Sequence, residues 1–434
     1  MAIELEARAA APTDVRPPRH SGAYLTYVVV LLAVVNVFNF ADRTVISVLM
    51  PAMKVELSLS DTQLGVLSGF AFAIFYATLG IPIAGLADRS IRRNIISAAL
   101  IIWSSMTAIC GLAQNFFHLL AARVGVGVGE AGCLPASHSV LGDYFPPKQR
   151  SGVLAIHTAG STVGMMAGLM IGGWLVSRFG WRETFILVGA PGIVLAIVVR
   201  LTLKEPARGG HDTPSQSTAG AAEPSTLLGL IKSRPSYIHL AMVFGGAGFV
   251  AFGLQQWLPS FYVRSYGMSI AQVGLVYGAV SGLASTVGAL GGGYVGDRLL
   301  QRGALIVITY AAGCYALAFL FKVALLTSNS AGLSLTFNFF SSLFGLAAHG
   351  PVFALIQGVT PPRLRARAAA LLTLLTSLIG TGAGPFFIGL MSDLYASSGP
   401  ESLRHALLWC SAFALWPIVH LVLARRTIEA DIKA

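Results

Sequence analysis

Two pairs of charged residues lie inside long apolar stretches in the first third of the sequence. Asp42 and Arg43 fall in the first stretch, and Arg123 and Glu130 fall in the fourth. If these stretches lie in a bilayer, each charge costs roughly 2.5–3.5 kcal/mol unless it finds a partner or a water-filled cavity. Burial favours the protonated form of a carboxylic acid, whereas a nearby arginine favours the carboxylate. A change in pairing can therefore load or release a proton.

The chemistry of these four residues predicts two roles, proton binding by the acids and anion binding by the arginines. We expect Asp42 to be the main proton-coupling residue and Glu130 to be the second, either protonatable itself or in contact with a bound ligand. Arg43 and Arg123 can bind a phosphate group through paired hydrogen bonds. The alternative is a permanent salt bridge that holds the first helix against the fourth.

The spacing of these residues allows them to meet. With a first helix over Tyr24 to Met50, Asp42 lies eight residues before its end, and Arg123 lies about seven residues after the start of the fourth helix. At 1.5 Å per residue both are roughly 10–12 Å deep. Glu130 follows Arg123 at i+7 on the same helix face. We therefore expect two carboxylates to bracket Arg123.

Two asparagines extend the polar surface of the first helix. Asn36, Asn39 and Arg43 follow i, i+3, i+7 spacing, which places them on one face of a helix. A polar stripe in an apolar helix is expected to face a cavity. Asn36 and Asn39 are therefore candidate binding residues.

The composition of the chain indicates which elements must hold these residues. The 434 residues are 55% hydrophobic and only 11% charged, with a mean hydropathy of +0.72. Soluble domains carry about 25% charged residues, so the composition excludes an ordinary soluble protein. Twelve apolar stretches reach the roughly 20 residues needed to cross a bilayer. We predict an all-α membrane protein with twelve transmembrane helices in two pseudo-symmetric six-helix bundles.

The basic residues predict the orientation of the chain. Of 29 Lys and Arg residues, five are expected on the outer side. They are Lys54, Arg178, Arg182, Arg264 and Arg404. This bias follows the positive-inside rule and predicts that both termini are cytoplasmic. The net charge of +11 is thus explained without a nucleic acid partner. The expected location is a bacterial inner membrane.

The sequence divides into two related halves. Asp88-Arg89 recurs as Asp297-Arg298 at an offset of 209 (297 − 88), and PPKQR at 146–150 recurs as PPRLR at 361–365. The predicted parts are a cytoplasmic tail (1–22), an N-terminal bundle (23–203), a cytoplasmic linker (204–234), a C-terminal bundle (235–424) and a cytoplasmic tail (425–434). Two bundles related in this way predict alternating access to a central site.

The membrane charges occur in one repeat only. The positions equivalent to Asp42 and Glu130 are Ala251 (42 + 209) and Phe339 (130 + 209). A pure packing role would be expected in both copies, so the asymmetry favours a functional role.

The loop AGLADRSIRRN at 84–94 resembles the signature loop of the major facilitator superfamily, and GYVGDRLLQR at 293–302 resembles its weaker copy. The resemblance implies that these charges gate the cytoplasmic side. The gating candidates are Asp88, Arg89, Arg92, Arg93, Asp297, Arg298 and Arg302. Positive-inside anchoring is the alternative for Arg92 and Arg93.

Within that superfamily, three segments resemble the Spinster family of lipid transporters. They are NFADRTVI at 39–46, RVGVGVGEAG at 123–132 and DYFPPKQRSG at 143–152. The resemblance implies proton-linked movement of lysolipids, sphingoid phosphates or similar amphiphiles. The expected partners are the amphiphilic substrate, protons and membrane lipids, for a monomer without cofactor or metal.

A glycine series in the fifth stretch supports a second function. Gly164 and Gly168 belong to this series, which resembles a motif of proton-driven drug antiporters, so export of small lipophilic compounds is the alternative function. Close helix packing explains the same glycines equally well. A non-transporting receptor is disfavoured by the intact repeats. Phosphate-loop, zinc-protease and nucleophile-elbow motifs are absent from the sequence, so no enzyme is predicted.

Overall fold

The computed structural model describes residues 21–87, 89–208 and 226–433 as helices joined by short loops. Twelve helical segments in this part of the chain are long and apolar enough to cross a membrane. The predicted all-α fold with twelve spans is confirmed. Asp88, most of the predicted N-terminal tail and residues 209–225 of the predicted linker lie outside the described residues.

The N-terminal half contains six of the spans, two of which are each built from two consecutive helices. Its helices are α1 (Gly22–Glu56), α2 (Asp61–Ser68), α3 (Phe70–Ala87), α4 (Arg92–Cys110), α5 (Phe116–Glu130), α6 (Cys133–Tyr144), α7 (Pro147–Phe179) and α8 (Trp181–Thr202).

The C-terminal half contains the other six spans, and two of its helices include a π-helical segment. Its helices are α9 (Leu227–Ser233), α10 (Pro235–Tyr266), α11 (Ile270–Gln272), η1 (Val273–Tyr277), α12 (Gly278–Leu300), α13 (Ala304–Thr327), α14 (Ala331–Val359), η2 (Pro362–Leu364), α15 (Arg365–Leu375), η3 (Thr376–Ala383), α16 (Gly384–Leu394), η4 (Ala396–Glu401), α17 (Ser402–Ala412), α18 (Leu415–Ala424) and α19 (Ile428–Lys433). The short helix α9 lies within the predicted linker and α19 within the predicted tail.

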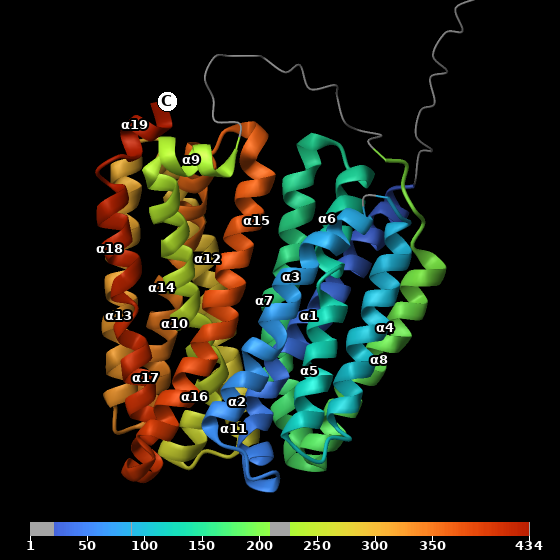
Figure 1. The fold of residues 1–434 in the computed structure, drawn as a ribbon, viewed down its shortest axis with the longest axis vertical. Coiled ribbons are helices and arrows are strands. Elements are labelled where there is room, and N and C mark those ends of the chain that lie inside the picture. The colour runs from blue at the N-terminus through green and yellow to red at the C-terminus, as the bar shows by residue number, and fades with distance from the viewer. Residues whose placement is uncertain (1–20, 88, 209–225, 434) are drawn as a thin grey trace, which may run out of the picture.

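The two halves stand side by side, with most of α1–α8 on the right of Figure 1 and most of α9–α19 on the left, while α2 lies between them beside α16. The described chain begins at α1 and ends at α19 at the upper end of this view, which we call the terminal face. The other end, where α2 and α11 lie, is called the opposite face. Contacts between α2 and α16 join the halves near this opposite face.

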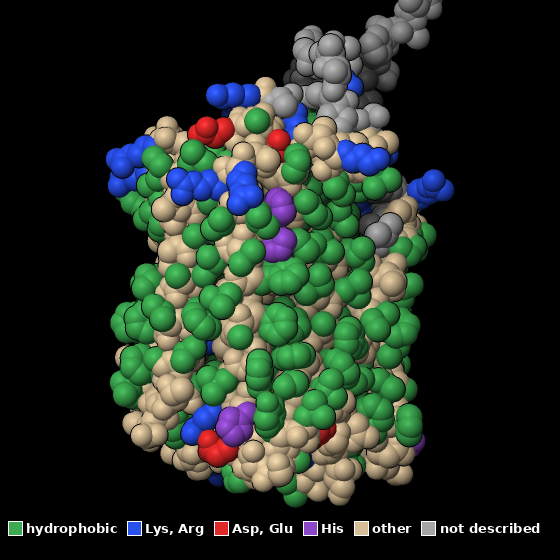
Figure 2. Space-filling model, turned by 60° about the vertical axis from the view of Figure 1, so that its left-hand side comes forward, with side chains coloured by type: hydrophobic (Ala, Val, Ile, Leu, Met, Phe, Trp, Pro, Cys, Tyr) green, Lys and Arg blue, Asp and Glu red, His purple; other side chains and the backbone are tan. Residues whose placement is uncertain are grey.

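The outer surface has the polarity that a bilayer requires. On the face shown in Figure 2, hydrophobic side chains cover the middle of the molecule, and charged side chains gather at the two ends. Large apolar residues such as Val194 and Leu290 are more than half exposed. Exposed apolar surface of this extent is stable in lipid but not in water.

Glycines allow α1 and α7 to approach closely. A Cβ added at Gly164 would lie 2.4 Å from the Val37 carbonyl oxygen, and one at Gly168 would lie 2.6 Å from that of Ala41. Without side chains at these positions, the helix backbones are in contact. This packing fixes the part of α1 that carries Asp42.

The first helix is longer than expected. It runs to Glu56 rather than Met50, and Pro51 lies within it. Proline removes one backbone donor, but a helix can continue past it when neighbouring helices support the freed groups. The last turn of α1 carries Lys54, which contacts α2.

Candidate functional site

Two buried ion pairs form the centre of the N-terminal half. Arg123 Nη1 on α5 lies 3.8 Å from Asp42 Oδ2 on α1, as the depth argument predicts. Glu130 differs from the expectation, because its Oε2 accepts a 2.6 Å hydrogen bond from Arg43 Nε. The site thus contains two arginine–carboxylate pairs rather than one arginine between two carboxylates. The prediction paired charged side chains by their depth in the membrane alone. The long side chain of Arg43 on α1 reaches Glu130 on α5, although the two residues were not expected to pair.

The Asp42–Arg123 pair retains unused hydrogen-bonding capacity. Thr107 Oγ1 donates to Asp42 Oδ1 at 2.5 Å, while Asp42 Oδ2 has no hydrogen-bond partner. Arg123 Nε and Nη1 also lack partners, although the residue is 1% exposed. Buried donors without acceptors are unfavourable. Arg123 is therefore suited to binding a further anionic or carbonyl oxygen.

Arg43 lies in an aromatic cage that remains partly open. Its guanidinium carbon lies 5.0, 4.6 and 4.5 Å from the ring centroids of Phe40, Phe72 and Tyr76. The side chain is 21% exposed, whereas that of Glu130 is fully buried. Contact with the rings orients the planar guanidinium, and its two terminal nitrogens can still bind a ligand in the plane of the guanidinium. Arg43 is thus the most accessible of the four charges.

The asparagine stripe is packed more tightly than expected. Asn36 Nδ2 donates to the His157 backbone oxygen on α7 at 2.8 Å, so this side chain faces a helix rather than an open cavity. Asn39 is also buried, at 6% exposure. Helical periodicity placed both residues on one face but could not show which neighbour covers that face.

A second charged cluster, which the sequence did not predict, joins the two halves near the opposite face. Asp61 at the start of α2 accepts two hydrogen bonds of 2.7 Å from Arg264 on α10. Lys54 Nζ donates to Asp61 at 2.5 Å, and Ser392 Oγ on α16 donates at 2.6 Å. One carboxylate therefore binds side chains from both halves.

A second carboxylate completes this cluster. Asp393 at the end of α16 accepts from the backbone nitrogens of Asp61 and Thr62, at 3.0 and 2.7 Å, and from Thr62 Oγ1 at 2.6 Å. An anion at a helix N-terminus satisfies free backbone donors and the helix dipole. We call Lys54, Asp61, Thr62, Arg264, Ser392 and Asp393 the opposite-face cluster.

The sequence did contain a signal for this cluster. Ser60 and Gln63 form a capping box at the start of α2, and Ser269 and Gln272 form the repeated one. Asp61 has no equivalent in the second repeat, because position 270 (61 + 209) is isoleucine. Asp61, like Asp42, is therefore an acidic residue that occurs in the first repeat and is replaced by an apolar residue in the second.

Two gating candidates of the first loop, Arg92 and Arg93, join parts of the N-terminal half at the terminal face. Arg92 Nε donates to Glu205 at 2.7 Å, and its Nη1 donates to Ser139 at 2.8 Å and to Asp143. The Arg93 backbone nitrogen also donates to Glu205, at 3.1 Å. These contacts join α4 to α6 and to the segment after α8, so they lie within one half.

The other gating candidates have weaker contacts. Arg89 is exposed, and Asp88 lies outside the described residues. The Arg298 guanidinium lies 4.1 Å from the Tyr294 ring centroid. In the described part of the C-terminal half, no ion pair joins Asp297, Arg298 or Arg302 to another residue.

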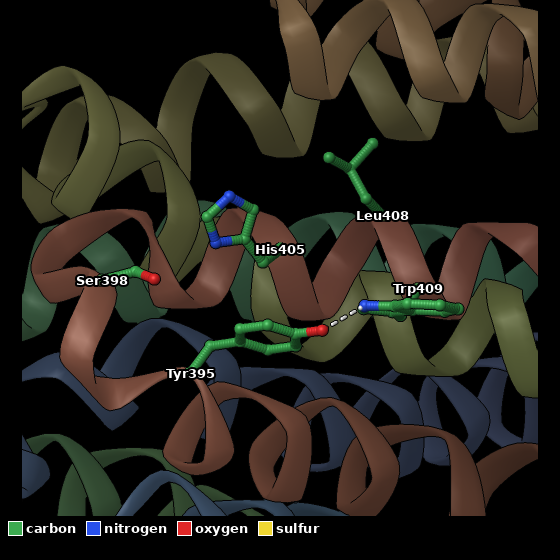
Figure 3. A pocket seen from close by; sticks show the side chains of 5 residues that line it. All are labelled: Tyr395, Ser398, His405, Leu408 and Trp409. Atoms are coloured by element: carbon green, nitrogen blue, oxygen red, sulfur yellow. Dashed lines mark hydrogen bonds between the residues drawn. The ribbon is translucent and has the colours of Figure 1, made fainter.

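A surface hollow lies where the end of α16 continues into η4 and α17. It has a volume of about 330 Å³ and is formed by η4 and α17, with Tyr395, Ser398, His405, Leu408 and Trp409 around it (Figure 3). Trp409 Nε1 donates to the Tyr395 hydroxyl at 2.8 Å across the hollow. It contains none of the residues expected to bind substrate.

Twelve apolar spans in two halves, with charges buried between the spans, define an integral multi-pass membrane protein. The chain belongs to the major facilitator superfamily, whose family model matches residues 32–424. This membership confirms the predicted superfamily, and it identifies the chain as a transporter rather than an enzyme.

Individual relatives refine this assignment. An MFS-type efflux pump of Mycolicibacterium smegmatis is 33% identical, covering 92% of each chain. Protein spinster homolog 1 of Xenopus laevis is 24% identical over 88% of this chain and 77% of the relative. A crystal structure of a bacterial homologue of the human lysosomal transporter Spinster, inward-facing and unoccupied, superposes with a TM-score of 0.84 at 31% identity. That match covers 95% of this chain and 99% of the homologue, which confirms the predicted similarity to Spinster proteins.

Proposed function

We propose that this transporter is proton-coupled and moves a lysolipid, a sphingoid phosphate or a similar amphiphile by alternating access. The observation that carries the proposal is the pair of buried arginine–carboxylate contacts, Asp42 with Arg123 and Glu130 with Arg43. Carboxylates in such positions change their proton affinity when an arginine moves away. The similarity to Spinster proteins supports a lipid-like substrate.

In this proposal, the substrate and the two carboxylates compete for the same two arginines. A phosphate that binds the partly exposed Arg43 removes a hydrogen bond from Glu130, and one that binds Arg123 weakens the contact with Asp42. A buried carboxylate that loses its cation is more stable when protonated. Occupancy of the substrate site and protonation of Asp42 or Glu130 are therefore linked. Asn36 and Asn39 support the shape of this site through packing.

We propose that the described conformation faces the cytoplasm. The opposite-face cluster holds the two halves together, and the structural relative in an inward-facing conformation supports the same state. The positive-inside bias supports cytoplasmic termini in a bacterial inner membrane. Opening the opposite face then requires Asp61 to separate from Arg264, while the terminal-face charges, Asp297 and Arg298 among them, form new contacts.

The alternative is a drug/proton antiporter that exports small lipophilic organic compounds. The similarity to a mycobacterial efflux pump over 92% of both chains favours this function specifically. In that case Asp42 and Glu130 would bind a cationic or neutral drug, and the two arginines would have a structural role. In both cases the working unit is proposed to be a monomer without cofactor.

A substrate panel separates the two functions. The purified transporter is placed in proteoliposomes, and uptake of a fluorescent lysophospholipid is measured with a sphingoid phosphate or a lipophilic cation as competitor. The proposal predicts inhibition by the phosphate-bearing amphiphile and little effect of the cation. Direct uptake of the lipophilic cation is measured in the same proteoliposomes, and uptake of the cation without uptake of the lysophospholipid would contradict the proposal and support the antiporter.

A further inference from the structure

Two histidines from the first and last spans of the C-terminal half meet near the terminal face. His239 lies in the second turn of α10 and His420 lies in α18, and their Nδ1 atoms are 3.1 Å apart. The ring centroids are 5.3 Å apart, and both residues are half-buried. Neither residue contacts the charged centre.

The separation of the two nitrogens has the size of a metal chelate. With metal–nitrogen bonds of about 2.05 Å, a 3.1 Å separation corresponds to a nitrogen–metal–nitrogen angle of roughly 100°. This angle lies between octahedral and tetrahedral values. In the described structure the ring centroids, 5.3 Å apart, show that the two Nδ1 atoms point toward each other, as in a hydrogen bond from one Nδ1–H to the other Nδ1. Both rings must therefore tilt for their lone pairs to meet at one ion.

We propose that His239 and His420 form a bidentate site for a divalent transition-metal ion such as Cu²⁺, Ni²⁺ or Zn²⁺. Neutral imidazole nitrogen is a preferred ligand for these ions. The ring that donates the hydrogen bond shifts its proton from Nδ1 to Nε2 when the metal binds, so both rings remain neutral. The site then carries the charge of the ion and requires no redox step.

The remaining ligands must come from solvent or from the membrane interface. No group of three or more His, Cys, Asp and Glu residues suited to a metal occurs in the described part of the chain. Asp431, the acid near the start of α10, accepts from the backbone nitrogen and hydroxyl of Ser236 and is not directed to the histidines. Because His239 and His420 are only half-buried, such oxygen ligands from outside the protein can reach the ion.

The neighbouring tryptophan provides a local reporter. The Trp416 ring centroid lies 5.0 Å from that of His420. Cu²⁺ quenches the fluorescence of an indole at this distance. Metal binding also joins α10 to α18, so it should stabilise the C-terminal half against heating.

The test titrates CuCl₂ into the detergent-solubilised full chain after removal of any purification tag. Electron paramagnetic resonance should show two equatorial imidazole nitrogens per Cu²⁺. The chain has six tryptophans, so the total tryptophan fluorescence should fall by the share of Trp416 at one ion per chain. His239→Gln and His420→Gln should each lower the affinity at least tenfold, and Cu²⁺ should raise the Tm of the wild type but not of the double variant. Glutamine preserves a hydrogen bond between the helices.

His138→Gln is the matched control, because His138 forms another histidine contact, with His157 at a centroid distance of 5.1 Å. This variant should bind Cu²⁺ as the wild type does. A wild-type spectrum with one imidazole or none, or unchanged binding in the double variant, would overturn the proposal. Loss of these nitrogens in either single variant assigns them to His239 and His420, whereas a wild-type spectrum without them overturns the proposal whether or not a variant folds.

Discussion

At the scale of single residues, the centre of the N-terminal half contains two positive and two negative charges on two membrane spans. Arg43 and Glu130 are in direct contact at 2.6 Å, and Asp42 and Arg123 are 3.8 Å apart. Removing one member of a buried pair leaves an uncompensated charge, whereas replacing both leaves none. If a residue of the pair has only a structural role, replacing both residues should restore stability and transport together. If it has a functional role, stability should return while transport stays impaired.

The Arg43–Glu130 pair gives the first prediction. Arg43→Met should destabilise the fold by about 3–5 kcal/mol because Glu130 stays buried without its cation. Adding Glu130→Leu should recover most of that loss, while transport should remain impaired in both variants. Thermal unfolding in detergent and flux measurements check the two parts. A double variant as unstable as the sum of the single losses would contradict the pairing.

Thr107 gives the second prediction. Its hydroxyl donates to Asp42 Oδ1 and so stabilises the carboxylate over the protonated acid. Thr107→Val removes this donor with little change in shape. If Asp42 carries the coupled proton, the midpoint of the pH dependence of flux should move to higher pH. Thr309→Val, in the C-terminal half, is the control, and equal pH profiles for all three proteins would argue against the role of Asp42.

At the scale of elements, glycines on α7 determine where α1 can lie. A Cβ at Gly168 would approach both the Ala41 carbonyl oxygen and Thr44 Oγ1 to 2.6 Å. Gly168→Ala should therefore push α1 away and cost about 1–3 kcal/mol. Gly313→Ala, where nothing lies within 4 Å, should be neutral or stabilising by up to about 1 kcal/mol. Thermal unfolding of both variants checks this, and equal effects would contradict the packing argument.

The sequence predicted the elements better than the contacts between them. Hydropathy identified the twelve spans, and depth predicted the Asp42–Arg123 contact even though α1 ends six residues later than expected. The partner of Glu130 was missed because the reach of an arginine side chain is not visible in helix periodicity. The Asp61–Arg264 contact was missed because it joins helices of different halves, which requires knowledge of the conformation.

At the scale of the whole molecule, the opposite-face cluster joins the two halves in the described conformation. Asp61→Asn removes the charge that binds Arg264 and Lys54, so it should shift the population toward separation of the halves at this face. Spin labels at Val55 and Leu394, exposed near the ends of α1 and α16, should then show a longer distance.

Glu56→Gln is the control for this experiment. Glu56 accepts from Trp181 and Arg182, which belong to the same half, so its replacement should not alter the distance between the labels. An unchanged distance in Asp61→Asn would show that this cluster does not hold the two halves together.

The central claim is that Asp42 couples protons to transport of an amphiphile. The most direct measurement is uptake of a lysophospholipid into proteoliposomes, with and without an imposed pH gradient, for the wild type and for Asp42→Asn. The proposed function predicts gradient-dependent uptake by the wild type and its loss in a variant that remains folded by size-exclusion chromatography. Uptake by Asp42→Asn with the same response to the gradient would contradict the claim.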